Sequence, residues 1–276
     1  MPITVPALHR ASAILDALSD SPHGLSLAEV CDRLKIPKST AHNLCWTLVQ
    51  VGQASRDERG TFRIGTAPLR YAHAFVQQTD LVREFTGALN ADGHLPDAHW
   101  LLSVLEGDQI LFLSSFGAHD PFSPGFVPGM RLPALYAATG KAILATLPEE
   151  EIRRLHAGRP RAPLTRHSVD SIEAFMVQRE SIRERGYAIC ADEVREGTLY
   201  YAAPVFDGTR SCASAGISVS LPSSRPSVAD QRKAAGALLR VASALSLRLG
   251  ASINAGLGAE QAPLAVRPKA AARVRS

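Results

Sequence analysis

Apolar residues at the start of the chain recur at helical spacing. Between Ala7 and Leu18 they lie three and four positions apart, which predicts an amphipathic helix along this stretch: Leu8, Ala11, Ile14, Leu15 and Leu18. A second helix is predicted from Ser26 to about Leu34. It begins with the pattern "SLAE", in which the Ser26 hydroxyl and the Glu29 carboxylate can each accept a hydrogen bond from the other residue's free amide.

A third helix, predicted from about Lys38 to Val51, has two faces of different chemistry. Pro37 suits its first position, where a backbone N–H would have no partner. At about 100° per residue, one side is apolar: Ala41, Leu44, Cys45 and Leu48. The opposite side carries hydroxyl, imidazole, amide and indole groups: Ser39, His42, Asn43, Trp46 and Gln50, with Thr40 and Thr47 at its edge. Such groups read base edges or bind phosphate oxygens.

Two extended runs follow, "QASRD" and "TFRIG", and the turn at Gly60 between them predicts a β-hairpin. Helices followed by such a hairpin form a winged helix-turn-helix, whose recognition helix lies in the major groove. The predicted DNA contacts lie on that helix and on the wing: Lys38, Ser39, Thr40, His42, Asn43, Trp46, Thr47, Arg56, Arg59 and Arg63. For Trp46 a second interpretation stays open, in which the indole packs under the wing or against the linker.

The rest of the chain alternates between helical and strand-like patterns. Residues 1–65 form the predicted DNA-binding domain, and residues 66–88 predict one linker helix. Residues 89–252 predict an α+β domain, with strands at "HWLLSVLEG", "QILFLSSF", "GYAICADE", "TLYYAAPVF" and "SCASAGISVSL" and helices at "YAATGKAILATL", "PEEEIRRL", 171–185 and 227–249. Residues 253–276 are rich in Ala and Arg and are expected to be a disordered basic tail.

The charge distribution supports a polyanion-binding end. Residues 1–78 carry 8 Lys and Arg against 6 Asp and Glu, and residues 253–276 carry 4 against 1, whereas residues 79–252 carry 18 against 19. Basic ends on a near-neutral middle suit a small nucleic-acid-binding head. No stretch approaches the roughly 18 apolar residues of a membrane span, and no signal-peptide pattern opens the chain. We therefore expect a cytoplasmic protein.

Motifs for catalysis and for metal binding are incomplete. "ATGKA" resembles part of a phosphate-binding loop, but Leu135 and Ala142 stand where that loop needs Gly and Ser or Thr. "AGISVS" resembles half of a nucleophile elbow, but Ser220 replaces its second Gly and no His follows His167. We therefore predict no catalytic residue.

Four cysteines are scattered without a C-x-x-C pair, which argues against a zinc ribbon or a disulfide scaffold. Cys190, Asp192 and Glu193 could join a distant His around zinc, but a solvated strand end is the favoured interpretation. His94 and His99 flank Pro96, which breaks the helical spacing of a ligand pair. No cofactor or metal is predicted.

Several stretches together resemble bacterial transcriptional regulators of the IclR family, over roughly residues 7–250. The resemblance rests on "LSLAEVCDRLKIPKSTAHNLCWTL", "PALYAATGKAILA", "RERGYAICADEVREG" and "AAPVFD…GISVSLP". It implies a winged helix that dimerises on DNA, joined to a GAF-like α/β domain. A small organic ligand, often a carboxylate, would bind in that second domain and alter operator affinity.

The sequence departs from the family pattern at positions that predict a preference for certain bases in the operator and for a certain class of effector. Asn43 stands where the family often has Arg, and Asn favours adenine, which it can bond through N6 and N7. In the effector domain Leu135, Ala137 and Tyr200 replace the family's frequent His, Thr and Cys, so we expect a more apolar or aromatic acid. The residues expected at the effector are Met130, Leu135, Tyr136, Asp192, Tyr200, Ser218 and Ser220.

The sequence thus predicts a homo-oligomeric regulator, a dimer or tetramer, that binds a pseudo-palindromic double-stranded DNA operator and senses a small organic acid. The alternative is a ligand-sensing or protein-interaction module that does not bind DNA. Salt dependence separates the two, since binding to phosphates releases counterions. Repression or activation, the effector and the target genes are not decided by the sequence.

Overall fold

The computed structural model describes residues 5–78, 80–91, 95, 98–117, 126–158, 162–169, 171–209, 211–220 and 226–251. The chain divides into two compact units, Met1–Thr79 and Asp80–Ser276, referred to below as the N-terminal and C-terminal units. The predicted tail, 253–276, lies outside the described residues. Among the described helices, none is both long and apolar enough to cross a membrane.

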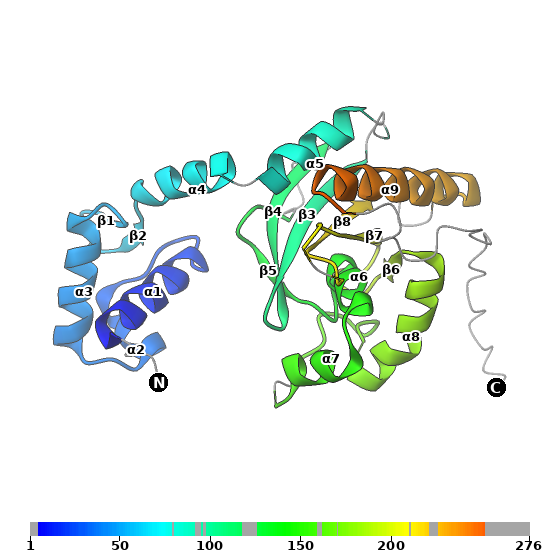
Figure 1. The fold of residues 1–276 in the computed structure, drawn as a ribbon. Helices are drawn as coiled ribbons and strands as arrows, with labels where there is room; N and C mark the ends of the chain where they lie inside the picture. The colour runs from blue at the N-terminus through cyan, green and yellow to red at the C-terminus, as the bar shows by residue number, and fades with distance from the viewer. Residues whose placement is uncertain are drawn as a thin grey trace, which may run out of the picture. The chain divides into compact units, whose positions relative to one another are not determined.

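The N-terminal unit is a winged helix-turn-helix followed by one more helix (Figure 1). Its elements are α1 (Pro6–Ser19), α2 (Leu27–Leu34), α3 (Lys38–Gln50), the antiparallel hairpin β1 (Ala54–Arg56) and β2 (Phe62–Ile64), and α4 (Ala67–Gln78). The predicted capping box is present at α2: Glu29 N–H donates to Ser26 Oγ at 3.3 Å, and Ser26 N–H donates to Glu29 Oε2 at 2.7 Å. Hydrogen bonding by the Ser26 amide, and secondly by the Ser26 side chain, holds the pKa of the Glu29 carboxylate below its usual range.

One hydrophobic cluster holds these elements together. Its buried members come from the three helices, from the loop before α2 and from the hairpin: Ile14, Ala17, Leu18, Leu25, Val30, Ala41, Cys45, Leu48, Ala54 and Phe62. The loop before α2 lies close to the wing, because Leu25 and Phe62 exchange backbone hydrogen bonds of 2.9 and 2.7 Å. Gly24 permits this approach, since a Cβ there would lie 2.4 Å from Phe62 O. One local prediction is corrected: α3 begins at Lys38, so Pro37 precedes the helix and does not open it.

The predicted single linker helix over 66–88 is wrong, because the structure has two helices there. The first, α4, ends at Gln78, and α5 (Asp80–Ala91) belongs to the C-terminal unit. The apolar side of α5 is buried in the core of that unit through Val82, Phe85, Ala88 and Leu89. The half-buried Glu84 of the same helix accepts a hydrogen bond of 3.1 Å from Arg248 of α9 (Val228–Arg248).

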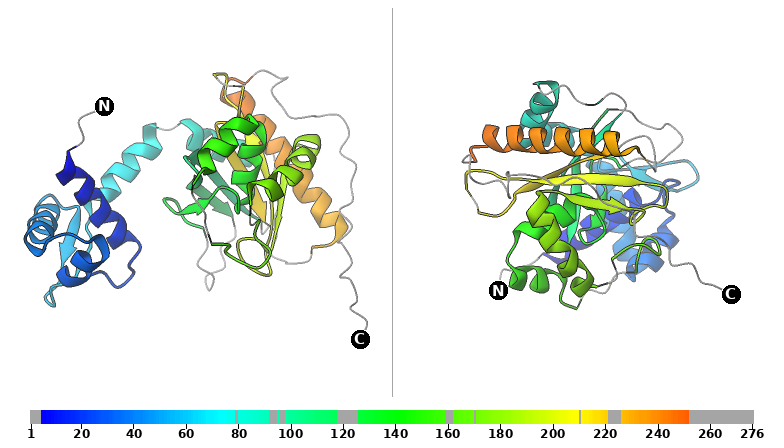
Figure 2. Two further views of the ribbon diagram at one scale, coloured as in Figure 1. Left: turned by 90° about the horizontal axis from the view of Figure 1, so that it is seen from below. Right: turned by 90° about the vertical axis from the view of Figure 1, so that its right-hand side faces the viewer.

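The described residues of the C-terminal unit form a six-stranded antiparallel sheet with helices on both faces (Figures 1 and 2). The strand order is β5-β4-β3-β8-β7-β6, from β3 (His99–Glu106), β4 (Gln109–Gly117), β5 (Arg131–Pro133), β6 (Ala188–Ala191), β7 (Leu199–Val205) and β8 (Ala215–Ser220). One face is covered by α5 and α9, and the other by α6 (Ala138–Thr146), α7 (Glu149–His156) and α8 (Ile172–Arg185). The predicted α/β class of this domain is confirmed, whereas β5 is an addition that the sequence pattern did not predict.

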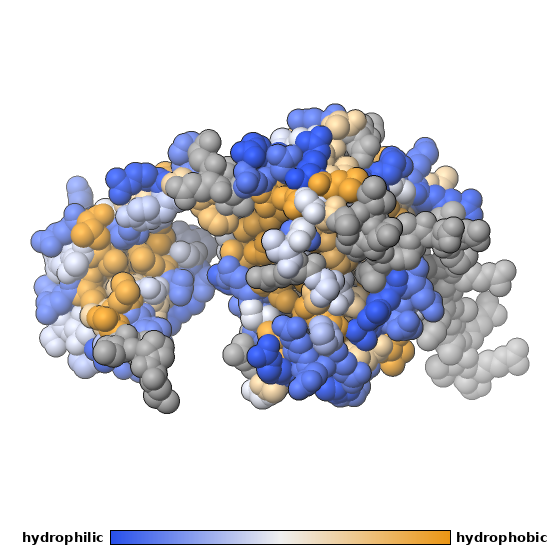
Figure 3. Space-filling view, viewed as in Figure 1, coloured by the Kyte–Doolittle hydropathy of each residue, from blue (hydrophilic) through white to orange (hydrophobic). Residues whose placement is uncertain are grey.

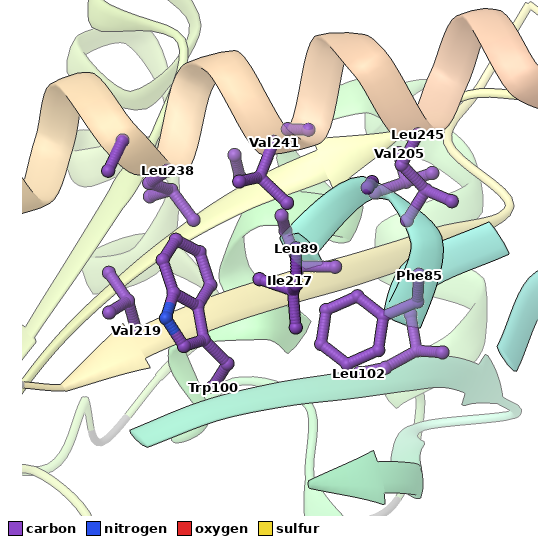
Figure 4. Packing of buried hydrophobic residues seen from close by; sticks show 14 of the residues in the cluster. Phe85, Leu89, Trp100, Leu102, Val205, Ile217, Val219, Leu238, Val241 and Leu245 are labelled. Atoms are coloured by element: carbon purple, nitrogen blue, oxygen red, sulfur yellow. The ribbon is translucent and has the colours of Figure 1, made fainter. Parts of the chain in front are cut away.

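Alternation along the central strands divides the core into two layers. Trp100 and Leu102 of β3 and Ile217 and Val219 of β8 point toward α5 and α9, where they pack against Leu238 and its neighbours (Figure 4). The residues between them on the same strands face α6, including Leu101 and Ser218, which pair across β3 and β8. This second layer contains the cavity described below.

Candidate functional site

The outer face of α3 is polar and open to solvent. Ala41, Cys45 and Leu48 are buried, as the periodicity predicts. The predicted contact residues of this helix are exposed, apart from the half-buried Thr40: Lys38, Ser39, His42, Asn43, Trp46 and Thr47. Several of their hydrogen-bonding groups can therefore meet a nucleic acid without any change in the core.

Trp46 is part of a small cluster on this face. Its Nε1–H donates to Nε2 of His42 at 2.8 Å, and the two rings meet at a 64° angle. The guanidinium of Arg56 in the wing lies 5.4 Å from the centre of the indole and 5.7 Å from the ring of Phe62. Trp46 keeps 39% of its surface exposed. The indole thus contacts a wing residue but is not buried under the wing.

The three wing arginines have different surroundings. The guanidinium of Arg63 donates to the carbonyl oxygen of His23 at 3.3 and 3.2 Å and lies 3.5 Å from the Asp57 carboxylate. A hydrogen bond from the Thr61 amide holds the pKa of Asp57 below its usual range. Arg63 therefore anchors the hairpin, and Arg56 stacks on α3. Arg59 is exposed at the hairpin turn.

A cavity lies between the sheet and the first turn of α6. It holds about 240 Å³ of empty space, part of it open to solvent. Its lining is mostly apolar and comes from strands, loops and α6: Leu101, Phe112, Phe126, Leu132, Ala137, Ala138, Thr139, Val194, Tyr200 and Ser218. Phe126 stacks on Phe112 with ring centres 4.9 Å apart and meets the edge of Tyr200 at 5.6 Å. One side of the cavity is thus an aromatic wall.

Hydrogen-bonding groups gather where α6 begins. Thr139 and Ser218 are almost fully buried, and Thr139 Oγ1 has no hydrogen-bond partner among the residues that the structure describes. The helix is preceded by Ala137, whose side chain cannot cap it, so the first amides of α6 have no partner from that side chain. Such a helix end attracts anions. Among the described residues that line the cavity there is no Lys, Arg or His, so hydroxyls and amides are the donors that this lining offers.

Gly140 explains how α6 starts so close to the preceding loop. A Cβ at this position would lie 2.2 Å from Ala134 O. The "ATGKA" stretch therefore serves close packing, and Lys141 is directed into the protein instead of toward a phosphate.

The structure brings together only part of the predicted effector set. Tyr200 and Ser218 line the cavity, and burial raises the pKa of Tyr200. Leu135 and Tyr136 precede α6 without lining the cavity, and the carbonyl of Tyr136 accepts a bond from Cys190 Sγ at 3.2 Å.

The other three predicted effector residues also lie outside the lining. Met130 is 36% exposed, and its carbonyl accepts the Phe112 amide at 3.0 Å. Asp192 has φ +61°, and its carboxylate accepts the Gly197 amide at 2.6 Å. Ser220 is half-buried at the end of β8. Thr139, Phe112 and Phe126 line the cavity and were not singled out by the sequence pattern.

A buried ion pair lies next to the cavity wall. Lys141 Nζ lies 2.6 and 2.5 Å from the two carboxylate oxygens of Glu193 and 2.9 Å from Oε1 of Gln178. The side chains of Lys141 and Glu193 are 0% and 9% exposed. Burial raises the pKa of Glu193, and the neighbouring Lys141 acts in the opposite direction. The interpretation of Glu193 as a solvated strand end is therefore wrong.

The ion pair connects α6, α8 and the segment after β6. Lys141 lies two residues after Thr139, and Glu193 directly precedes Val194, so both partners hold residues of the cavity lining. Cys190 lies nearby, and burial raises the pKa of its thiol to about 12. Within the part of the chain that the structure describes, no group of three or more His, Cys, Asp and Glu could hold a metal ion.

Comparisons with known proteins match both units to the same protein family. Residues 7–58 match the family model described as the IclR helix-turn-helix domain, and residues 73–247 match the model described as bacterial transcriptional regulator IclR C-terminal. The HTH-type transcriptional regulator BhcR of Paracoccus denitrificans is 32% identical over 251 residues, which are 91% of this chain and 89% of that protein.

Solved structures of transcriptional regulators also match this chain over most of its length. The repressor BlcR of Agobacterium tumefaciens is 37% identical, with a TM-score of 0.57 and coverage of 90% of this chain and 98% of that one. The IclR transcriptional regulator of Alicyclobacillus acidocaldarius has a TM-score of 0.78 at 23% identity, with coverage of 90% and 100%, and it supports the fold alone.

Proposed function

Because this chain belongs to the IclR family of bacterial transcriptional regulators, we propose that it binds a pseudo-palindromic operator through α3 and the wing, and that a small organic acid in the cavity of the C-terminal unit controls this binding. DNA-binding regulation follows from the family. The contact residues, the oligomer and the effector are the proposed part.

On the DNA side, the exposed face of α3 carries the proposal. Asn43 is the main base-reading residue, because its amide can bond N6 and N7 of one adenine together. Lys38, Ser39 and Thr40 lie at the start of the helix, where side chains and amides bind phosphate or base edges. Arg59 is the proposed wing contact with the backbone, since Arg56 and Arg63 hold the wing itself.

On the effector side, the unpartnered buried hydroxyl of Thr139 carries the proposal. A polar group without a partner in an apolar site costs stability, and a bound ligand oxygen would satisfy it. We assign the ligand carboxylate to the first amides of α6 with Thr139 and Ser218, and its apolar body to the wall of Phe112, Phe126 and Tyr200. The cavity encloses little space and is partly open to solvent, which favours a small monocarboxylic acid.

We further propose that two or more copies act together, in the cytoplasm where the operator lies. A two-fold dimer reads half-sites about one helical turn apart, or a multiple of that. Exposed apolar side chains on α4 support self-association: Leu69, Tyr71 and Phe75. Hydrophobic residues also gather over β4 and β5 (Figure 3). We propose repression as the mode, on the likeness to BlcR, whose structure is described as that of a repressor.

The effector changes operator affinity only by the difference in its own affinity for the two states of the protein. A ligand that binds the DNA-competent and incompetent states equally has no effect. The coupling free energy can therefore be measured as the change in effector affinity caused by DNA or as the change in DNA affinity caused by the effector.

The test is a titration of the purified full chain against duplex DNA selected from a random library, at two salt concentrations. We expect sequence-specific binding that weakens steeply with salt and that Asn43→Ala weakens further. Binding of no DNA by a folded protein would contradict the DNA part of the proposal.

The effector part is tested in the same titration with benzoate, butyrate and benzyl alcohol. We expect benzoate to change DNA affinity more than butyrate, and benzyl alcohol, which lacks the carboxylate, to have little effect. Thr139→Val should weaken the response to benzoate, whereas the control Thr86→Val, whose hydroxyl bonds Val82 O within α5, should not. An equal response in both variants would contradict the assignment of Thr139.

A further inference from the structure

The hydrogen bond between Trp46 and His42 fixes the chemistry that His42 offers to DNA. We propose that Trp46 is a positioning residue for operator recognition, which sets the base preference of His42 by deciding which of its ring nitrogens carries the proton. The proposal rests on the DNA-binding function assigned to α3. It goes beyond that function because it gives Trp46 a role in specificity without direct contact to a base.

The chemistry follows from the donors involved. The indole N–H can only donate, and a neutral imidazole has one donor and one acceptor nitrogen. Since Trp46 Nε1 donates to His42 Nε2 at 2.8 Å, Nε2 must be the acceptor and the proton must lie on Nδ1. The indole N–H is also used up by this bond. The pair therefore presents one group to a partner, the Nδ1–H donor of His42.

The wing keeps the indole in place for this bond. Arg56 lies over the indole at 5.4 Å and over Phe62 at 5.7 Å, and Phe62 is buried in the core of the N-terminal unit. On α3 itself, His42 and Trp46 are four residues apart, a spacing that brings side chains together on one helix face. The indole is thus held between the wing and the recognition helix.

A ring that can only donate discriminates between base edges. In the major groove it can pair with O6 or N7 of guanine, O4 of thymine or N7 of adenine, but it cannot accept from the exocyclic amine of cytosine or adenine. Without the indole N–H, the exposed ring of His42 can carry its proton on either nitrogen and can accept as well as donate. Loss of the Trp46 bond should therefore relax base preference at the position that His42 reads.

The variant that tests this is Trp46→Phe, because phenylalanine keeps an aromatic face for Arg56 and lacks the N–H. The full chain is first used to select duplexes from a random library. Affinities are then measured for every single base-pair change in the selected sequence, for the unchanged protein and for His42→Ala, Trp46→Phe and the double variant. Trp100→Phe, at the buried tryptophan of the C-terminal unit, is the control for losing an indole away from α3.

We expect Trp46→Phe to lower discrimination by about 3- to 10-fold, the range of one hydrogen bond, at the same base pair of each half-site that His42→Ala affects. The double variant should lose no more there than His42→Ala alone, and Trp100→Phe should behave like the unchanged protein. Unaltered discrimination in Trp46→Phe, or a change at a different base pair, would overturn the proposal. So would a selected sequence at which His42→Ala changes no base preference.

A spectroscopic measurement checks the proton directly and needs no operator. Nitrogen-15 NMR of the histidine side chains distinguishes the two neutral tautomers. The proposal expects His42 as the Nδ1–H form in the unchanged protein and a mixture of forms in Trp46→Phe. An Nε2–H form in the unchanged protein would overturn it.

Discussion

In the N-terminal unit, the polar side chains of α3 meet each other at the surface, where Trp46, His42 and Arg56 stay in contact with solvent. In the C-terminal unit, Lys141 and Glu193 meet inside the protein. The first arrangement leaves its donors available to another molecule. Lys141 and Glu193 cannot be exposed without opening the core. They therefore hold the cavity wall in position and do not contact a partner directly.

The energetic consequences of the two arrangements also differ. Exposed hydrogen bonds and cation–π contacts contribute about 0.5–1.5 kcal/mol each. Removal of one partner from a buried ion pair costs about 3–5 kcal/mol, because the other charge stays buried without compensation. A substitution on α3 should therefore change binding, whereas a substitution of the ion pair should change folding.

The largest expected effect is that of Lys141→Met. It leaves the Glu193 carboxylate buried without its cation, so the free energy of unfolding of the C-terminal unit should fall by about 3–5 kcal/mol. Urea unfolding followed by circular dichroism measures this change. The matched substitution Lys38→Met, on the exposed face of α3, should change stability by less than about 0.5 kcal/mol and should weaken DNA binding.

The double variant Lys141→Met with Glu193→Leu separates charge from packing. It removes both charges from the core, so most of the lost stability should return. If Lys141→Met alone unfolds at the same urea concentration as the unchanged protein, the pair is not buried as described and the contrast between the two units fails.

A smaller loss of stability is expected from Gly140→Ala at the start of α6. The new Cβ would lie 2.2 Å from Ala134 O, and such overpacking costs about 1–3 kcal/mol. Gly236→Ala in α9 is the control, because the nearest atom to its new Cβ is 3.6 Å away and alanine favours a helix interior by about 0.5–1 kcal/mol. Thermal unfolding should show opposite shifts, and a stabilised Gly140→Ala would contradict the close packing at α6.

Each unit also contains a buried thiol whose titration can be followed. Burial raises the pKa of Cys45 from 9.0 to about 11 and that of Cys190 from 9.0 to about 12. Because the folded state then binds the proton more tightly than the unfolded state, this contribution to stability is complete below pH 9 and is lost as the pH rises toward 11 in the N-terminal unit and 12 in the C-terminal unit.

The melting temperature should accordingly fall between pH 8 and pH 11, and Cys45→Ala should make the fall shallower in the N-terminal unit. Iodoacetamide at pH 8 should modify both thiols slowly in the folded protein and quickly in urea, since the thiolate is the reactive form. Fast modification of Cys190 in the folded chain would show that its surroundings are open.

Local patterns predicted the N-terminal unit well and the C-terminal unit only in outline. The two faces of α3 and the capping box at Ser26 depend on residues within four positions of each other, so periodicity and spacing are sufficient. The partner of Lys141 lies 52 residues away, and no local pattern specifies such a pairing. A lone charge within the apolar run "ATGKAILA" was the available signal that Lys141 is buried.

The candidate effector residues also come together through contacts that no local sequence pattern specifies. Alternation along β8 places Ser218 on the face opposite Ile217, but only the antiparallel register shows that it pairs with Leu101 of β3 and lies beside Thr139 of α6. The break between α4 and α5 also escaped the pattern, because both helices are amphipathic and follow each other directly. The two helices belong to different units: α4 is part of the N-terminal unit, and α5 packs in the core of the C-terminal unit.

The smallest expected effect is that of Thr47→Ala on α3. The Thr47 hydroxyl donates to Asn43 O at 2.8 Å within the same helix, so it is less available to DNA than the amide of Asn43. Stability should change by less than about 0.5 kcal/mol, and DNA affinity should fall far less than in Asn43→Ala. Equal losses in fluorescence-anisotropy titrations would show that Thr47 contacts DNA directly.

The chain has two tryptophans, and each unit contains one of them. Trp46 is partly exposed and Trp100 is fully buried, so their emission maxima should be separated, with Trp46 at the longer wavelength. One unlabelled sample can therefore report on the two units independently as it is heated or titrated. Addition of DNA should change the red side of the spectrum and addition of an effector the blue side, so that the order in which the units respond can be followed in time.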